Sequence, residues 1–516
     1  MKTNCLVALF FFLAAFHIIA QPAAPNDRPN IIIILTDDLG YGDVQCLGGD
    51  RSKIATPNID RLAAAGMTFI ETHGSSSVCT PSRYSILTGR YNWRSTLQKG
   101  VLGAYGSTLI SQDRLTVAGM LKQQGYATAC IGKWHLGWKW PRAGNNFDFS
   151  QPIAEGPTSV GFDYYFGTDI PNYPPYCFIE NDHTVGIPSV PLPKNLIGGN
   201  LASKPGLSLP GWSLEAILPT ITDKACGYIS TQAKKGTPFF LYFAMTSPHT
   251  PLAVLPEWRG KSGLHSVYAD YVMETDAMIG RVLKAVEENG IDNNTLVMFA
   301  SDNGCAPYIG VAMLEKQGHF PSADRRGYKA DIWDGGHRIP FLARWPGKIK
   351  AGSSSAQLVS LTDLMATCAD IVGAKIPENA GEDSVSLLPV MLGAATAPLH
   401  EAVVFHSING SFAIRQGPWK LDLCASSGGW SAPKPGSKEA KQLPPVQLYD
   451  MTKDVGERTN EYKDHPEIVA QLTKLLEKYI ADGRTTPGPL QKNDAPIQLW
   501  KEGRTDDETL QKETDY

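Results

Sequence analysis

The sequence has no strong excess of charge of either sign. It holds 47 Lys and Arg residues against 51 Asp and Glu residues in 516, for a net charge of −4. No nucleic-acid partner is therefore expected, because nucleic-acid-binding domains carry a marked basic excess. Internal repeats are absent, and beyond the first 20 residues no apolar run is long enough to cross a bilayer, so no membrane span is expected. Nine scattered cysteines lack the spacing of a metal site.

The first 20 residues have the pattern of a signal peptide. Lys2 supplies a positive start, residues 6–15 are apolar, and residues 18–20 (IIA) offer a cleavage site. The sequence therefore predicts that residues 1–20 are removed and that the mature protein is exported, to the periplasm or the medium.

A large first unit alternates strand-like and helix-like segments. Residues 31–35 (IIIIL) form a continuous apolar run, which is typical of a parallel strand buried on both faces. Further strands are predicted at 126–131, 239–245 and 296–300, and helices at 58–65 (capped by Asn58), 115–125 and 268–288. Such alternation favours an α/β fold, and we assign residues 28–395 to one N-terminal domain.

The pattern changes after residue 395. Short strands at 402–405, 412–415 and 419–421, followed by an amphipathic helix over 468–480, predict a small antiparallel sheet packed on one helix. We assign residues 396–516 to this C-terminal subdomain and a tail. Earlier in the chain, residues 141–220 are rich in Pro, Gly, Asn and Ser, which predicts a long loop insertion of the kind that carries specificity.

Reactive residues follow four of the predicted strands. Ligands of open α/β sheets bind at the carboxyl ends of the strands, so these side chains are expected at one edge of the sheet. Polar residues are common after any strand, but four such cases together favour a functional site. The residues are Asp37 and Asp38, Lys133 and His135, His249, and Asp302 and Asn303.

The acidic members of this set resemble a cation site. Asp37, Asp38, Asp302 and Asn303 offer only oxygen ligands, which suit Ca²⁺, with Mg²⁺ as the alternative, and not a soft metal. Crowded carboxylates repel one another, and a divalent cation relieves that repulsion. The competing interpretation is turn formation, because Asp-Asp and Asp-Asn-Gly are common turn sequences.

Cys79 lies in residues 79–83 (CTPSR), followed by residues 87–90 (LTGR). Pro81 suits the first position of a helix, which would leave Cys79 just ahead of the helix N-terminus. Free N–H groups and the helix dipole favour an anion there, and Arg83 could reach back toward it. The competing interpretation is a small buried cysteine.

These segments together resemble the type I sulfatases. Residues 79–90 match the family's cysteine signature, residues 132–137 (GKWHLG) and 247–251 (SPHTP) match two further segments, and Lys329 occupies the place of a second active-site lysine. One departure is Asp334, where the family often has Glu. The resemblance extends from about residue 29 to 488 and implies the alkaline-phosphatase-like mixed sheet flanked by helices.

The resemblance also implies a mechanism. A maturation enzyme would oxidise Cys79 to formylglycine, whose hydrated aldehyde attacks sulfur, and the metal set would be Asp37, Asp38, Cys79, Asp302 and Asn303. Lys133 and Lys329 would hold the sulfate charge, and Arg83 would hold the hydrated aldehyde. His249 would protonate the leaving oxygen, and His135 would take the proton that lets sulfate depart.

The expected substrate is a sulfated carbohydrate. Residues 173–183 resemble a segment of family members that act on galactose or N-acetylgalactosamine sulfates, and there Asp182 and His183 could hydrogen-bond a sugar hydroxyl. The same loop could equally pack against the fold alone. Two other functions stay open on the residues: a phosphate or phosphonate hydrolase on the same scaffold, and a glycan-binding protein without catalysis.

Overall fold

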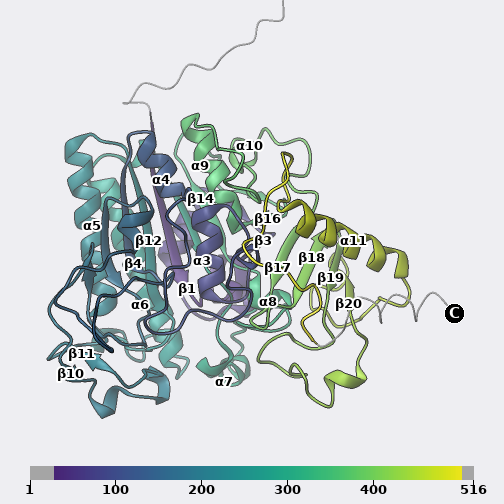
Figure 1. Ribbon diagram of the computed structural model, residues 1–516, viewed down its shortest axis with the longest axis horizontal. Coiled ribbons are helices and arrows are strands. Elements are labelled where there is room, and N and C mark those ends of the chain that lie inside the picture. The colour runs from purple at the N-terminus through teal and green to yellow at the C-terminus, as the bar shows by residue number, and fades with distance from the viewer. Residues whose placement is uncertain (1–27, 503–516) are drawn as a thin grey trace, which may run out of the picture.

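The computed structural model describes residues 28–502, so the predicted signal peptide lies outside the described residues. A ten-stranded sheet crosses the larger part of the molecule (Figure 1) in the order β15-β2-β14-β13-β1-β12-β4-β7-β8-β9. Its five central strands are parallel to one another: β13 (Thr295–Ser301), β1 (Asn30–Asp37), β12 (Phe239–Pro248), β4 (Ala127–Lys133) and β7 (Tyr164–Thr168). Antiparallel pairings begin on either side of this group, at β14 (Phe341–Arg344) and β8 (Ile179–Glu180). The predicted mixed α/β fold is confirmed.

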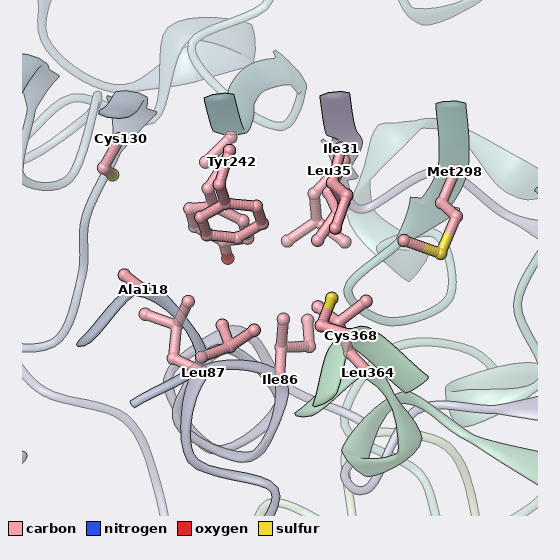
Figure 2. Close-up of a cluster of buried hydrophobic side chains, with 14 of the residues drawn as sticks. Ile31, Leu35, Ile86, Leu87, Ala118, Cys130, Tyr242, Met298, Leu364 and Cys368 are labelled. Carbon is pink, nitrogen blue, oxygen red and sulfur yellow. The ribbon is translucent and has the colours of Figure 1, made fainter. Parts of the chain in front are cut away.

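Both faces of β1 are buried, as the isoleucine run predicts. Ile31, Ile33 and Leu35 face one core, and Ile32 and Ile34 face the other. Burying such a side chain contributes about 1.5–3 kcal/mol. Figure 2 shows the first of these cores, where side chains of β13, β1, β12 and β4 meet side chains of three helices. The edge of the sheet that carries Asp37 is thus held by a strand that has no exposed face.

Helices cover the two faces. On the first lie α3 (Cys79–Thr88), α4 (Val117–Gln123) and α9 (Leu364–Val372). On the second lie α2 (Pro57–Ala64), α5 (Ile217–Lys235) and α6 (Val267–Glu288). The α6 helix begins where the side chain of Ser266 accepts a hydrogen bond from the Ala269 backbone N–H. The remaining short elements are α1 (Gln45–Gly48), α7 (Val311–Lys316), α8 (Asp334–His337), α10 (Leu388–Met391), β2 (Met67–Phe69), β3 (Thr72–His73), β5 (Arg142–Ala143), β6 (Asn146–Phe147), β9 (His183–Thr184), β10 (Val190–Pro191), β11 (Leu207–Ser208), β15 (Ser353–Ser355) and β16 (Val359–Ser360).

A four-stranded antiparallel sheet with one helix forms the C-terminal part, as predicted. Its order is β17 (Val403–His406), β18 (Phe412–Gln416), β19 (Trp419–Asp422) and β20 (Gln447–Asp450). The helix α11 (Pro466–Asp482) lies against this sheet (Figure 1). Its Leu472, Leu476 and Tyr479 are buried in the core that the helix and the sheet share. The proposed boundary at residues 395 and 396 falls between the last strand of the large sheet and β17.

The segment after α11 contacts the residues that follow α3. Arg90, two residues beyond α3, donates from its two terminal nitrogens to the two carboxylate oxygens of Asp494, at 3.1 and 3.0 Å. Arg94 donates to the side-chain oxygen of Asn493 at 3.1 Å, and Leu499 is buried. The described part of the tail therefore fastens the residues that follow α3.

Three sequence-based predictions of local structure are wrong. The helix α2 begins at Pro57, because the side chain of Asn58 pairs with Asp276 and does not cap the helix. The helix α3 begins at Cys79, which makes Pro81 its third residue; that position also lacks an intrahelical N–H partner, so Pro is tolerated there. Residues 141–220 are not one loop, since they contribute β7 and β8 to the large sheet.

Within residues 28–502, no helix has both the length and the apolar character that a membrane span requires.

Candidate active site

The four predicted strand ends meet at one edge of the large sheet. The order β13-β1-β12-β4 makes these strands consecutive neighbours, all parallel. Asp37 ends β1 and Lys133 ends β4, while His249 follows β12 and Asp302 follows β13. The order of these four strands in the sheet therefore brings the four strand ends together.

Asp37 and Asp302 are joined by basic side chains. Lys133 donates from Nζ to one carboxylate oxygen of Asp37 at 2.8 Å. Arg83 donates from Nε to Oδ2 of Asp302 at 3.0 Å, and its Nη2 lies 3.5 Å from the other oxygen of Asp37. All four side chains are buried. Arg83 thus ties α3 to two strand ends.

Asp38 is the centre of a second group. Its backbone has a φ of 64°, a left-handed conformation that Asp tolerates. One carboxylate oxygen of Asp38 lies within 4.8 Å of ligand atoms of Asp37 and His249. Lys329 donates to both carboxylate oxygens of Asp38, at 2.6 and 2.7 Å. The amide of Asn303 donates to Oδ1 at 2.7 Å.

Cys79 lies at the first position of α3 and is 2% exposed. Its thiol is close enough to Arg83, Asp302 and Lys329 for a charge on it to act on the pKa of each. The eight cysteines of residues 28–502 are all unpaired, so no disulfide holds Cys79.

The two histidines have defined tautomers. Nε2 of His135 lies 2.9 Å from the carbonyl oxygen of Leu102, which can only accept, so Nε2 carries the proton and the unpartnered Nδ1 is an acceptor. Nδ1 of His249 lies 2.5 Å from the carbonyl oxygen of Thr250, which leaves Nε2 facing Asp38 at 3.7 Å. Burial lowers the pKa of His135 to about 3 and that of His249 to about 4, so both rings are neutral in the free protein.

The carboxylates are arranged as a cation site would need. Asp37 Oδ1 and Asn303 Oδ1 are buried and have no hydrogen-bond partner. Burial raises the pKa of Asp37, but the positive charges of Lys133, Arg83 and Lys329 outweigh it and hold that pKa far below its usual range. Burial and the neighbouring Asp37 raise the pKa of Asp302. The pKa values of these two neighbouring carboxyl groups shift in opposite directions because two negative charges side by side repel each other. A divalent cation bound between them would offset that repulsion.

Asp182 and His183 are not brought to this cluster. They lie at the turn between β8 and β9, where their side chains contact each other at 2.7 Å and are both about half exposed. Since β8 pairs antiparallel with β7, with Glu180 opposite Phe166, this turn lies toward the N-terminal end of β7, opposite to the edge that carries Lys133. Among the described residues, no hydrogen bond or ion pair links either side chain to the cluster.

Two supporting acids escaped the sequence prediction. Asp169, just after β7, accepts from the backbone N–H of His135 at 3.1 Å. Asp43 accepts from the backbone N–H of Gly40 at 2.8 Å and pairs with His319, which supports the turn after Asp38. Asp169 directly follows β7, and an Asp after a parallel strand is the same signal that identifies Asp37 and Asp302. The sequence does not predict β7, so this signal is not available for Asp169.

Comparison with known proteins gives a consistent result. A family model described as Sulfatase matches residues 29–374. The chain is 34% identical over 491 residues to the N-acetylgalactosamine-6-O-sulfatase of Bacteroides thetaiotaomicron, covering 88% of this chain and 93% of the relative. It is 33% identical over 503 residues to arylsulfatase A of Homo sapiens, covering 94% and 93%.

Solved structures agree with the fold. One Bacteroides thetaiotaomicron structure, described under the metabolism of multiple glycosaminoglycans, superposes with a TM-score of 0.76 at 31% identity and covers 88% of this chain and 99% of its own. The structure of Ps i-CgsB in complex with k-i-k-neocarrahexaose superposes with a TM-score of 0.68 at 25% identity, covering 90% and 95%.

Proposed function

The chain belongs to the sulfatase family and is a sulfuric ester hydrolase, and we propose that its substrate is a glycan end that carries a galactose or N-acetylgalactosamine sulfate. The observation that carries this proposal is the 34% identity, over 88% of the chain, to an enzyme named for N-acetylgalactosamine 6-sulfate. The complex of a similar fold with a neocarrahexaose also favours a glycan over a steroid or lipid ester.

The family generally uses a metal ion and a formylglycine. We propose Ca²⁺, with Mg²⁺ as the alternative, held by the oxygens of Asp37, Asp38, Asp302 and Asn303. The donor set is hard, and two of its oxygens accept no hydrogen bond. When bound, the cation would offset the sulfate charge and lower the pKa of a coordinated hydroxyl.

Cys79 is the proposed formylglycine position, and a maturation enzyme is the proposed partner that would convert it. The hydrated aldehyde would supply a hydroxyl nucleophile and a second hydroxyl from which the cycle is completed. Arg83 reaches the same region from within α3, where its Nη2 and Nε are fixed by Asp302. That anchoring would hold the modified side chain in one orientation without further reorganisation.

Two ammonium groups prepare the site for a tetrahedral anion. Lys133 and Lys329 are both buried, and each is already held by a carboxylate, Asp37 and Asp38 respectively. Their charges would stabilise the negative charge that grows on the sulfate oxygens as the ester bond breaks. Because the site is buried, each charge acts in a low dielectric and is worth more than in water.

The histidines would move the protons. Nε2 is the free nitrogen of His249, so this ring would take up a proton from water at Nε2 once the negative charge of the substrate has raised its pKa, and would pass that proton to the departing sugar oxygen. Nδ1 of His135 has no partner and can accept, so this ring would take the proton whose removal releases sulfate. The carbonyls of Thr250 and Leu102 hold the two rings in these tautomers.

Export to the periplasm or the medium remains part of the proposal, on the pattern of residues 1–20 alone. A sugar contact by Asp182 and His183 also stays a prediction. It is tested by Asp182→Ala and His183→Ala, and unchanged KM values for a sulfated sugar in both variants would overturn it.

Sulfate release from a panel of defined sugars tests the substrate. The protein is co-expressed with a maturation enzyme, and sulfates of galactose, N-acetylgalactosamine, glucosamine and uronic acids are compared, with Cys79→Ala as the inactive control. The proposal expects the highest kcat/KM on the galacto-configured sugars. Faster turnover of glucosamine or uronate sulfates would refute it.

A further inference from the structure

Two aromatic side chains stand exposed beside the active site. Among residues 28–502, Tyr308 and Trp430 are the aromatic residues that lie exposed at the surface, at 51% and 38%. They are more than a hundred residues apart in sequence, yet their ring centroids are 6.0 Å apart with the planes inclined at 44°. Two large rings that remain in water forgo the free energy of burial, and an exposed apolar patch of this kind often marks a binding site.

Tyr308 belongs to the loop that carries the acid site. It lies in the turn Pro307–Ile309, five residues after Asn303. The backbone N–H of Lys329 donates to the carbonyl oxygen of Cys305, three residues before Tyr308, so this turn lies against the segment that carries the proposed sulfate-binding lysine. The side chain of Tyr308 is half exposed beside that segment.

Trp430 is fixed to the lysine loop from the other domain. Its backbone N–H donates to Asp331 at 2.9 Å, and Ser431 donates to the same carboxylate. Asp331 lies two residues after Lys329, and the backbone N–H of Ile332 donates to Ser427 in turn. Trp430 therefore stands on a rigid loop, so little conformational entropy would be lost when a ligand packs against it.

The chemistry of the pair suits a sugar. The flat rings offer apolar faces to the C–H side of a pyranose, and the hydroxyl of Tyr308 and the indole N–H of Trp430 offer polar edges to sugar hydroxyls. Tyr308 belongs to the loop after Asn303, and Trp430 rests on the loop after Lys329, so both rings lie beside the groups proposed to hold the sulfate.

We propose that Tyr308 and Trp430 form a sugar-binding platform in which Tyr308 packs on the sulfated residue and Trp430 on the next sugar of the chain. This rests on the proposed function and deepens it, because it assigns a second sugar subsite and therefore a preference for oligosaccharides over monosaccharides. The C-terminal subdomain supplies that second subsite.

Two substrates separate the subsites: N-acetylgalactosamine 6-sulfate, and a disaccharide with the same residue at its non-reducing end. The wild type is expected to have a higher kcat/KM on the disaccharide. Trp430→Ala should lower the ratio of the two kcat/KM values by about tenfold, mainly through KM, since tenfold corresponds to the loss of one good aromatic contact. Trp430→Phe should restore most of the ratio, whereas Trp430→Leu, which keeps apolar bulk without a ring face, should not.

Tyr308→Ala should raise KM on both substrates, and Tyr308→Phe should retain most of the affinity because the ring remains. Leu490→Ala, at a side chain that is 72% exposed, is the surface control. A wild type without length preference, or a ratio unchanged in Trp430→Ala, would overturn the platform. If the wild type prefers a glucosamine or uronate sulfate, the galacto proposal fails instead, and the same variants are measured on monosaccharide and disaccharide forms of that sugar.

Discussion

Lys329 and Asp38 form a two-point contact in which one ammonium group donates to both oxygens of one carboxylate, at 2.6 and 2.7 Å. The lysine pKa is raised well above its usual value, because Asp38 and nearby Tyr308 outweigh the effect of burial. Lys329 is therefore charged at neutral pH. The proposed cation ligand and the proposed sulfate ligand position each other.

Removing either lysine should impair turnover more than folding. Lys133→Ala and Lys329→Ala are each expected to lower kcat about 10²- to 10³-fold, the usual loss for one preorganised charge at a developing anion. Sulfate release gives kcat, and thermal melting gives stability. Lys284→Ala, an exposed lysine of α6, is the control. Activity within twofold of the wild type in either variant would contradict the assigned role.

Removal of the cation should cost both activity and stability. Without it, Asp37, Asp38 and Asp302 repel one another, so a chelator is expected to lower the melting temperature and abolish sulfate release. Returning Ca²⁺ at about 100 times its Kd should restore about 3 kcal/mol. Differential scanning fluorimetry with Ca²⁺, Mg²⁺ and Zn²⁺ checks this. A chelated protein that keeps its melting temperature and its activity would rule the site out.

Gly132→Ala should disrupt the strand end that carries Lys133. Gly132 has a φ of 115°, and a Cβ there would lie 1.8 Å from the carbonyl oxygen of Ala244 on β12. Only a shift between two central strands can relieve that overlap, so a loss of about 3 kcal/mol or more is expected in urea unfolding.

The matched control is Gly227→Ala, in the interior of α5, where an added Cβ meets no atom within 4 Å. That change should be neutral or stabilise by up to about 1 kcal/mol. Equal destabilisation by both substitutions would argue that the β4–β12 contact is not the cause.

Glu274, which lies outside the candidate active site, should make the free energy of unfolding depend on pH. The residue is buried in α6; burial raises its pKa to about 7, from 4.5 in the unfolded chain, although the Leu255 N–H donates to it. A carboxyl with a raised pKa stabilises the fold below pH 4.5, and this contribution is lost as pH rises through 7. Glu274→Gln should therefore stabilise the protein by about 1–3 kcal/mol at pH 8 and have little effect at pH 4.5.

Urea unfolding at the two pH values measures this difference. Glu477→Gln, at an exposed position of α11, should show no such pH dependence. A Glu274→Gln variant that is equally stable to the wild type at pH 8 would show that the carboxylate is accommodated without cost.

Much of the site could be predicted because it depends on short segments at strand ends. The run Ile31–Ile34 identifies β1, and parallel strands necessarily bring Asp37 and Asp302 to one edge. The left-handed turn at Asp38 and the two-point contact from Lys329 follow from tertiary packing, which no local pattern encodes.

Other features lay beyond the sequence for definite physical reasons. The short strand β7 lies in a segment rich in Gly and Pro, where periodicity is too brief to detect. Tyr308 and Trp430 meet because residues 427–431 of the C-terminal part hydrogen-bond to Asp331 and Ile332, which follow Lys329. The turn at Asp182 and His183 was predicted to face the sugar, but its position follows from the antiparallel pairing of β8 with β7.

Asp494 and Asn493 are among the last described residues, yet they hold Arg90 and Arg94, which follow directly from the helix that begins at Cys79. A nascent chain on the ribosome has exposed residues 79–90 long before residue 494 is synthesised. During that interval the thiol lacks the enclosure it has in the finished protein, so an enzyme acting on Cys79 from outside has its best opportunity before translation ends. The time open to such an enzyme thus follows from where residues 493 and 494 bind.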